Sequence, residues 1–132
     1  MRTIRWMLMA VLAACTDGGD GSTAGFDETK TGDHGLYAFH LTSADVPQQG
    51  SNTFTLELTA SGSPVDGATV TVDALMPAHG HGSGTPITVS AAGNGRYTVG
   101  NVSFTMAGAW DLTCSASRAA SQDSATFHLD VP

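Results

Sequence analysis

The chain has 132 residues, a length typical of one domain, and a formal net charge of −7 at pH 7. Such an acidic chain is a poor partner for nucleic acid and for anionic lipid, because both repel negative charge. The composition is compatible with binding of cations, although acidic surfaces are common.

The first 14 residues have the organisation of a secretory signal peptide. Arg2 and Arg5 precede an apolar run, residues 6–14, which is too short to cross a bilayer as a helix. The run ends in Leu-Ala-Ala-Cys, which resembles the lipobox of bacterial lipoproteins. The resemblance implies cleavage before Cys15, lipidation of Cys15 and stable attachment to a membrane through more than one acyl chain. The alternative is an ordinary signal peptide with an incidental cysteine.

Residues 15–33 are predicted to form a flexible tether. They are rich in Gly, Asp and Thr and almost free of apolar side chains, so they cannot bury enough surface to offset their ordering entropy. Thr16 stands where an aspartate would resemble an inner-membrane retention signal, which favours the outer membrane, facing the periplasm. With Cys15 lipidated, Cys114 has no disulfide partner within the chain, so the domain is expected to depend on its apolar core.

From residue 34 to the C-terminus, apolar residues recur with a period of two, which predicts β-strands. Asn94-Gly95 predicts a hairpin, and a shift of the pattern near Gly100 predicts a bulge. The expected strands are residues 36–46, 52–60, 68–75, 87–91, 96–105, 109–115 and 125–131. Seven short strands without an amphipathic helix predict an immunoglobulin-like antiparallel β-sandwich over residues 34–132. Its expected core comprises Phe54, Leu56, Val70, Val72, Phe104, Trp110, Leu112 and Phe127.

If successive strands of this sandwich reverse direction, the loops at residues 47–51, 76–86 and 105–108 share one end. They bring together four side chains that can bind a soft metal ion: Met76, His79, His81 and Met106. Thioethers select Cu(I) and imidazole binds copper, zinc and nickel, so this set outside the cytoplasm predicts a copper site. No acidic residue lies between the two methionines, which disfavours calcium and magnesium.

A purely structural interpretation of the same residues stays open. Met76 and Met106 continue the inward parity of their strands, so both can fill the end of the core. The two histidines would then be solvated residues of a turn. The remaining imidazoles and the thiol are expected to be structural too, with His34, His40 and His128 on the surface and Cys114 buried and inert.

Three stretches, DALMPAHGHG at 73–82, GRY at 95–97 and FTMAGAWDL at 104–112, resemble the YtkA-like domain, which is related to FixH. The resemblance covers about residues 35 to 131, nearly the whole predicted domain. It implies an immunoglobulin-like β-sandwich outside the cytoplasm, with links to copper handling or to assembly of membrane oxidases. It supplies no established biochemical activity.

The chain is not expected to be an enzyme. It contains no Gly-x-Ser-x-Gly nucleophile motif, and the His79/His81 pair has no evident third fixed ligand or general base. The sequence therefore predicts an exported, lipid-anchored copper chaperone or buffer. The alternative is a non-catalytic interaction or assembly module that binds a membrane or periplasmic protein and holds no metal.

Overall fold

The structure is a computed structural model that describes residues 25–132. Its strands are β1 (Asp27–Thr31), β2 (Ala38–Thr42), β3 (Gly50–Ala60), β4 (Ser63–Pro64), β5 (Thr69–Met76), β6 (His81–Gly82), β7 (Thr88–Gly93), β8 (Arg96–Phe104), β9 (Gly108–Arg118) and β10 (Ser121–Val131). The described range contains no helix that is long and apolar enough to cross a membrane. The predicted signal peptide and Cys15 lie outside the described residues.

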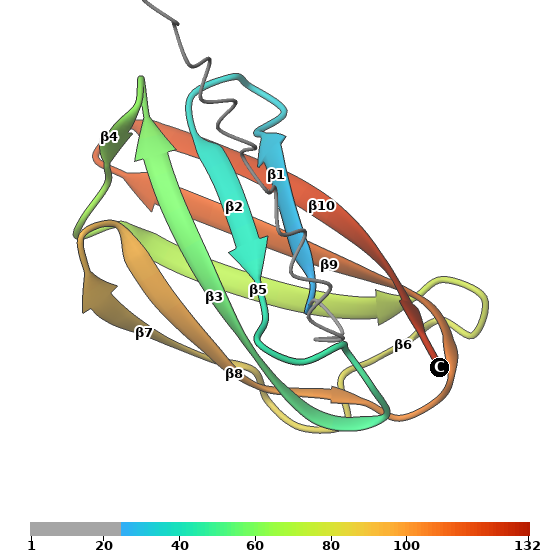
Figure 1. The fold of residues 1–132 in the computed structure, drawn as a ribbon. Helices are drawn as coiled ribbons and strands as arrows, with labels where there is room; N and C mark the ends of the chain where they lie inside the picture. Colours follow the sequence, from blue (N-terminus) through green and yellow to red (C-terminus); the bar gives the residue numbers. More distant parts are fainter. Residues whose placement is uncertain (1–24) are drawn as a thin grey trace, which may run out of the picture.

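Two antiparallel sheets pack face to face (Figure 1). One sheet has the order β1-β2-β3-β8-β7, with β4 paired to β3, and the other has the order β10-β9-β5-β6. The grouping of β2, β3, β8 and β7 against β5, β9 and β10 is that of a constant-type immunoglobulin domain. The predicted sandwich is confirmed, and all seven predicted segments form strands, although β2 is much shorter than the predicted 36–46.

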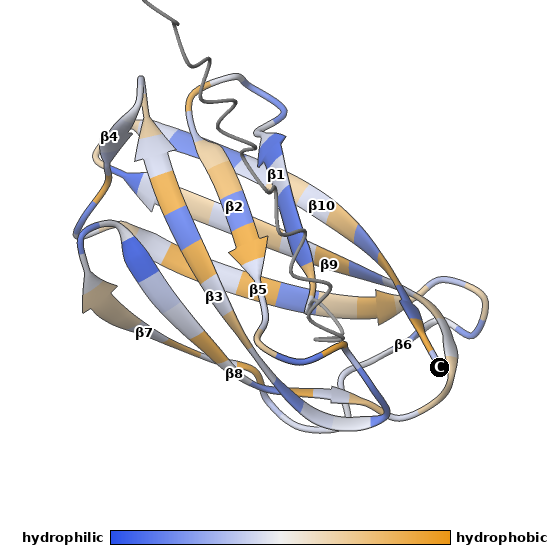
Figure 2. Ribbon diagram, in the orientation of Figure 1, coloured by the Kyte–Doolittle hydropathy of each residue, from blue (hydrophilic) through white to orange (hydrophobic). Residues whose placement is uncertain are grey.

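The inward faces of the two sheets form one apolar core. Hydrophobic and hydrophilic residues alternate along β3 in Figure 2, as expected for a strand with one buried face. Of the predicted core, Val70 is partly buried and the other seven side chains are buried. Cys114 lies in this core as predicted, and burial raises the pKa of its thiol to about 12, so it stays protonated at neutral pH.

Both predicted irregularities of β8 are present. Asn94 and Gly95 have φ values of 54° and 72°, the left-handed conformations that a two-residue hairpin turn between β7 and β8 requires. Further along, Asn52 pairs with Val102 whereas Phe54 pairs with Val99, so β8 carries one extra residue at this point. The extra residue is the predicted bulge, and it keeps both flanking parts of β8 in register with the core.

The prediction of a tether up to residue 33 is wrong for residues 27–31, which form β1 at the edge of the larger sheet. Its five residues, DETKT, include no apolar side chain, so a search for alternating apolar residues could not find it. Charged residues are common on edge strands, because they discourage pairing with other chains.

Two side chains connect this strand to the core and to the second sheet. The ring of Phe26 lies edge-on to Phe54 and Phe127, with centroids 6.3 and 6.2 Å away. Lys30 Nζ donates a hydrogen bond of 2.7 Å to the carbonyl of Thr126 on β10. β1 therefore bridges the two sheets, and the domain begins before residue 34.

Asp123 is a buried carboxylate at the start of β10, 1% exposed. It accepts hydrogen bonds of 2.7 to 3.2 Å from the backbone N–H groups of four residues, His34, Leu36, Tyr37 and Ser124. Burial alone would raise the pKa of Asp123, but these four donors favour the charged form and the pKa is lowered. The carboxylate thus fixes the turn between β1 and β2.

Candidate metal centre

The loops that follow β5 and β8 meet at one end of the sandwich, as the strand order predicts. The N–H of Gly84 donates a hydrogen bond of 3.1 Å to the carbonyl of Ser103. Gly50, at the start of β3, pairs with Phe104 at the end of β8. The three predicted loops therefore share the lower end of the molecule in Figure 1.

Met76 and His81 are direct cross-strand neighbours at this end. The carbonyl of Met76 accepts hydrogen bonds from the N–H groups of His79 (3.1 Å) and Gly80 (2.8 Å). Gly80 has a φ of 68°, a conformation that glycine adopts without strain, and the chain turns back so that His81 pairs with Met76. Residues directly opposite each other on neighbouring strands point to the same face of the sheet. Met76 faces the core, so the half-buried His81 lies beside it on the core side.

Trp110 on β9 lies beneath both loops and is fully buried. Its indole N–H donates a hydrogen bond of 2.9 Å to the carbonyl of Met106. Its ring lies edge-on to the imidazole of His81, with 5.5 Å between the ring centroids. Leu75 pairs with Asp111, so the same register places Met76 next to Trp110. One indole therefore adjoins three of the four predicted ligands.

The side chain of Met76 closes over the start of β9. A Cβ atom at Gly108 would lie only 2.7 Å from the terminal methyl carbon of Met76, and Gly108 has a φ of 130°. A residue other than glycine at this position would be strained and would displace Met76. Gly108, two residues after Met106 in the sequence, thus leaves room for the side chain of Met76.

The two methionines differ in burial, whereas the core-filling interpretation places both of them in the core. Met76 is 3% exposed and belongs to the core, as that interpretation predicts. Met106 is 40% exposed, so the expectation that it continues the inward parity of β8 is wrong: β8 ends at Phe104, and parity does not extend beyond the strand. His79 is exposed, and its ring centroid lies 5.8 Å from that of His81.

The predicted ligands thus form a graded series, from buried Met76 through half-buried His81 to exposed His79 and Met106. Residues 25–132 hold no group of three or more His, Cys, Asp or Glu side chains placed to bind a metal ion. The set at this end combines two thioethers with two imidazoles. These are soft to intermediate donors of the kind that suits Cu(I), and thioethers and imidazoles both bind metal ions as neutral ligands.

Residues 33–115 match the YtkA-like family, which is more than half of the chain. The chain belongs to the YtkA-like family. No curated protein and no solved structure matches it. The matched region contains Met76, His79, His81, Met106 and Trp110, so all parts of the candidate metal centre belong to the family domain.

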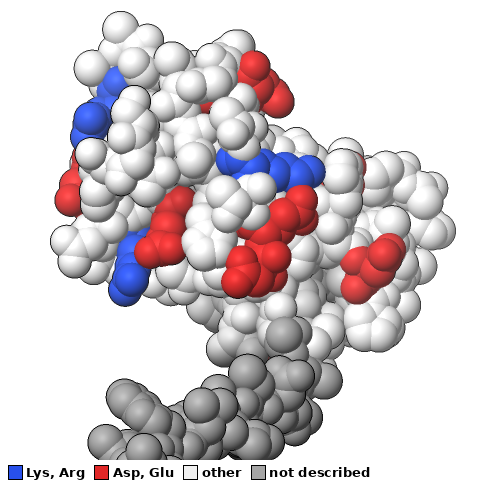
Figure 3. Space-filling model, turned by 45° about the horizontal axis from the view of Figure 1, so that its top comes forward, with Lys and Arg blue, Asp and Glu red and all other residues white. Residues whose placement is uncertain are grey.

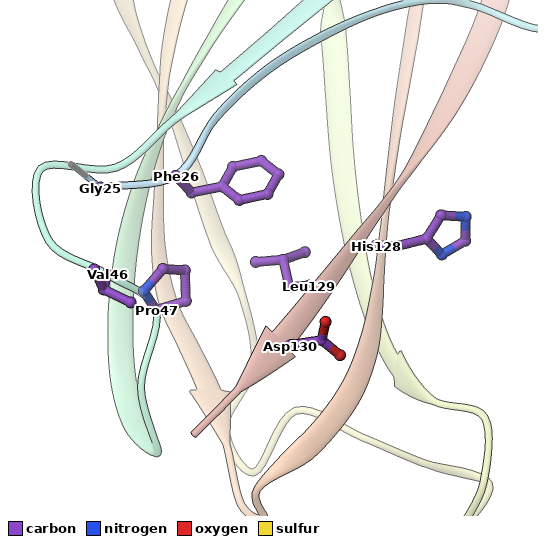
Figure 4. A pocket seen from close by; sticks show the side chains of 7 residues that line it. All are labelled: Gly25, Phe26, Val46, Pro47, His128, Leu129 and Asp130. Atoms are coloured by element: carbon purple, nitrogen blue, oxygen red, sulfur yellow. The ribbon is translucent and has the colours of Figure 1, made fainter. Parts of the chain in front are cut away.

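The YtkA-like domain has a separate hollow of about 240 Å³ between the segment before β1, the β2–β3 loop and β10 (Figure 4). Phe26, Val46, Pro47 and Leu129 supply its apolar walls. His128 points away from the hollow, and its Nδ1 lies 2.5 Å from the Asp111 carboxylate on the outer face of the sheet. None of the four predicted metal ligands lines this hollow.

The outer face of the larger sheet carries a row of charges that crosses four strands. His40 contacts Asp27 through Nε2 (2.8 Å) and Glu57 through Nδ1 (2.9 Å), and Arg96 donates to Glu57 (3.0 Å). Hydrogen bonds first to Asp27 and then to Glu57 raise the pKa of His40, and hydrogen bonds from His40 and Arg96 lower the pKa of Glu57. On the face shown in Figure 3, basic side chains likewise lie beside acidic ones.

The surface histidines lie where they were predicted, but all three side chains have partners that the sequence did not indicate. His128 and His34 are exposed and His40 is about one-third exposed. Two further residues have a role in the structure that the sequence does not indicate: Trp110 is predicted only to fill the core, and Asp123 is not among the predicted core residues. Asp123 has the same parity as the inward residues Ala125 and Phe127, and this pattern could have revealed a buried carboxylate.

Proposed function

We propose that this YtkA-like protein is an exported, lipid-anchored copper-binding protein, a chaperone or buffer, that binds one Cu(I) ion at the loop end of its sandwich. The candidate ligands are Met76, His79, His81 and Met106. The observation that carries the proposal is the convergence of the two loops on Trp110, which adjoins Met76, His81 and the backbone of Met106.

The graded exposure of the ligands suits a protein that takes up an ion and passes it on. Buried Met76 and half-buried His81 would supply a water-poor inner side, where neutral soft donors favour Cu(I). Exposed Met106 and His79 would be the side from which ligands of another molecule reach the ion. The buried Cys114 takes no part, because its thiol stays protonated and lies inside the core.

Competition titration with Cu(I), Cu(II) and Zn(II) against chelators of known affinity tests the proposal. We expect the protein, in detergent micelles, to bind one equivalent of Cu(I) in preference to the other two ions. The variant His79→Ala/His81→Ala should lose this binding, and His81→Ala alone should lose more affinity than His79→Ala. The matched control His34→Ala/His128→Ala removes two exposed histidines elsewhere and should bind as the wild type does. Absence of stoichiometric Cu(I) binding to the wild type would overturn the proposal.

The anchor is a separate part of the proposal and rests on Leu-Ala-Ala-Cys at residues 12–15. It would hold the protein on the membrane, with the outer membrane, facing the periplasm, as the proposed site. Cys15→Ser should move the protein from the membrane fraction to the soluble fraction without changing the β-sheet signal in circular dichroism. An intact mass of the wild type without acyl groups would refute lipidation.

A second function, a metal-free interaction or assembly module for a membrane or periplasmic protein, is favoured by the apolar exposure of the same end. Leu75 is 46% exposed and Met106 is 40% exposed, close to the turn that carries His79. Exposed apolar side chains often mark sites of protein association, although two side chains make a small patch. This function takes precedence if the titration detects no metal.

A further inference from the structure

We infer that Trp110 is a positioning residue that holds the two halves of the copper site in register before the ion arrives. The inference rests on the proposed function and goes beyond it, because Trp110 is not itself among the four ligands. It is carried by contacts of one fully buried side chain with two loops that lie 25 residues apart in the sequence, counted from His81 to Met106.

The first contact fixes Met106. Its side chain is 40% exposed and lies beyond the end of β8, where no strand pairing holds the backbone. The indole N–H of Trp110 donates to the Met106 carbonyl at 2.9 Å and so fixes the backbone from which the thioether projects. Fixing a ligand in advance lowers the entropic cost of binding, because less freedom is lost when the ion arrives.

The second contact supports His81. The imidazole stands edge-on against the indole at 5.5 Å between centroids, with 70° between the ring planes. This arrangement is favourable for aromatic rings and restricts the rotation of the imidazole. Phe104 lies behind the indole at 5.1 Å, and Trp110 is fully buried, so the indole cannot easily move away. The ring is therefore a rigid surface for His81 and its strand neighbour Met76.

Both contacts start from the same side chain, so a change at Trp110 should affect ligands from both loops. Substitution of Trp110 by Phe keeps an aromatic ring in the core but removes the N–H donor and some of the surface under His81. We expect Trp110→Phe to weaken Cu(I) binding by about tenfold to a hundredfold, the usual effect of losing a group that orients metal ligands. The affinity is measured by chelator competition with the full chain in detergent micelles.

Two readouts separate positioning from a general loss of stability. The first is a double-mutant cycle: Trp110→Phe should weaken Cu(I) binding less in a Met106→Ala background than in the wild type, because part of its effect passes through Met106. The second is the ¹³C signal of the methionine methyl groups. Cu(I) should shift the signals of Met76 and Met106 in the wild type, and the shift of Met106 should be reduced in Trp110→Phe.

Phe39→Leu is the control for destabilisation, because Phe39 is a fully buried aromatic residue on β2 that packs against Tyr37 and pairs with Leu58, towards the other end of β3. It should lower the melting temperature and leave the Cu(I) affinity unchanged. Equal losses of affinity in Phe39→Leu and Trp110→Phe, additive effects in the cycle, or unchanged binding in Trp110→Phe would each overturn the inference. If the wild type binds no Cu(I), the proposed function fails instead, so the two failures are distinguishable.

Discussion

The Asp123 carboxylate shows how much a single side chain organises at the entrance to β2. It takes up four backbone N–H groups that would otherwise lack partners in a buried turn. Asp123 also leaves no room for a side chain at position 32, since a Cβ atom at Gly32 would lie 2.1 Å from Asp123 Oδ2. The link between β1 and β2 thus depends on a charge that lies outside the candidate metal centre.

We expect Asp123→Asn to lower the free energy of unfolding at neutral pH by about 1–3 kcal/mol, because an amide accepts fewer of these bonds and adds donors that face other donors. The folded pKa of Asp123 is below its ordinary value of 3.8. Its contribution should therefore be present above pH 3.8 and be lost as the pH falls through the lower, folded pKa. Urea unfolding at several pH values measures both effects. The exposed Asp45→Asn is the control, and equal stability of the two variants would refute this role.

At the same scale, the sequence predicts which residues gather but not how deeply each is buried. Alternation correctly places Met76 inward because β5 continues to this residue. The same rule fails for Met106, because the rule holds only inside a strand and β8 ends two residues earlier. The bond from Trp110 to the Met106 carbonyl depends on how a loop folds back, which residue spacing does not encode.

Among the strands longer than two residues, β1 is the one that the sequence pattern does not predict. Its polar residues give no apolar alternation, and its attachment depends on Phe26, which precedes the strand and lies between Phe54 and Phe127. Six of the predicted strands have one buried face, and β7, in which only Val89 is partly buried, precedes the Asn94-Gly95 hairpin signal. β4 and β6 have only two residues each and are too short for a pattern. Sequence periodicity therefore reports burial rather than strand pairing.

Phe26→Ala should reduce the free energy of unfolding by about 2 kcal/mol, less than is usual for truncation of a fully buried aromatic residue, because Phe26 is only partly buried. It should also speed amide hydrogen exchange in β1, because the strand loses its apolar attachment to the core. Leu36→Ala is the matched control, since Leu36 is 45% exposed and should contribute little. An unchanged exchange rate in β1 would show that strand pairing alone holds it.

The charged row across β1, β2, β3 and β8 should make stability depend on pH. The folded pKa of His40 is above its ordinary value of 6.5, so its contribution is complete below pH 6.5 and is lost as the pH rises through the folded pKa. The folded pKa of Glu57 is below 4.5, so its contribution is present above pH 4.5 and is lost as the pH falls through the folded pKa. Both residues of the row therefore contribute fully to stability between pH 4.5 and pH 6.5.

His40→Gln should destabilise the protein at about pH 5.5 by less than about 1 kcal/mol, since the row is partly exposed to solvent. The difference from the wild type should shrink as the pH rises towards about 9, because a neutral His40 can donate only one hydrogen bond to its two carboxylate neighbours. Urea unfolding at both pH values measures the difference. A larger destabilisation at the higher pH would contradict the assignment of a protonated His40.

Over the whole molecule, residues 25–132 carry ten acidic and three basic side chains, and the basic ones are engaged within the domain. Lys30 binds the Thr126 carbonyl, Arg96 binds Glu57 and Arg118 binds the Asp66 carbonyl. A net negative surface attracts cations and raises their local concentration near the protein. The fold brings the candidate ligands together, because the turn between β5 and β6 and the loop between β8 and β9 lie at the same end of the sandwich.

X-ray absorption at the copper edge of the Cu(I)-loaded protein tests the central claim most directly, because it identifies the donor atoms around the ion. The proposed site predicts two sulfur donors and at least one imidazole nitrogen at roughly 2.0–2.4 Å, and the loss of both sulfurs in Met76→Leu/Met106→Leu. A first shell of nitrogen and oxygen alone in the wild type, or a sulfur count that the double variant leaves unchanged, would contradict the Met/His site.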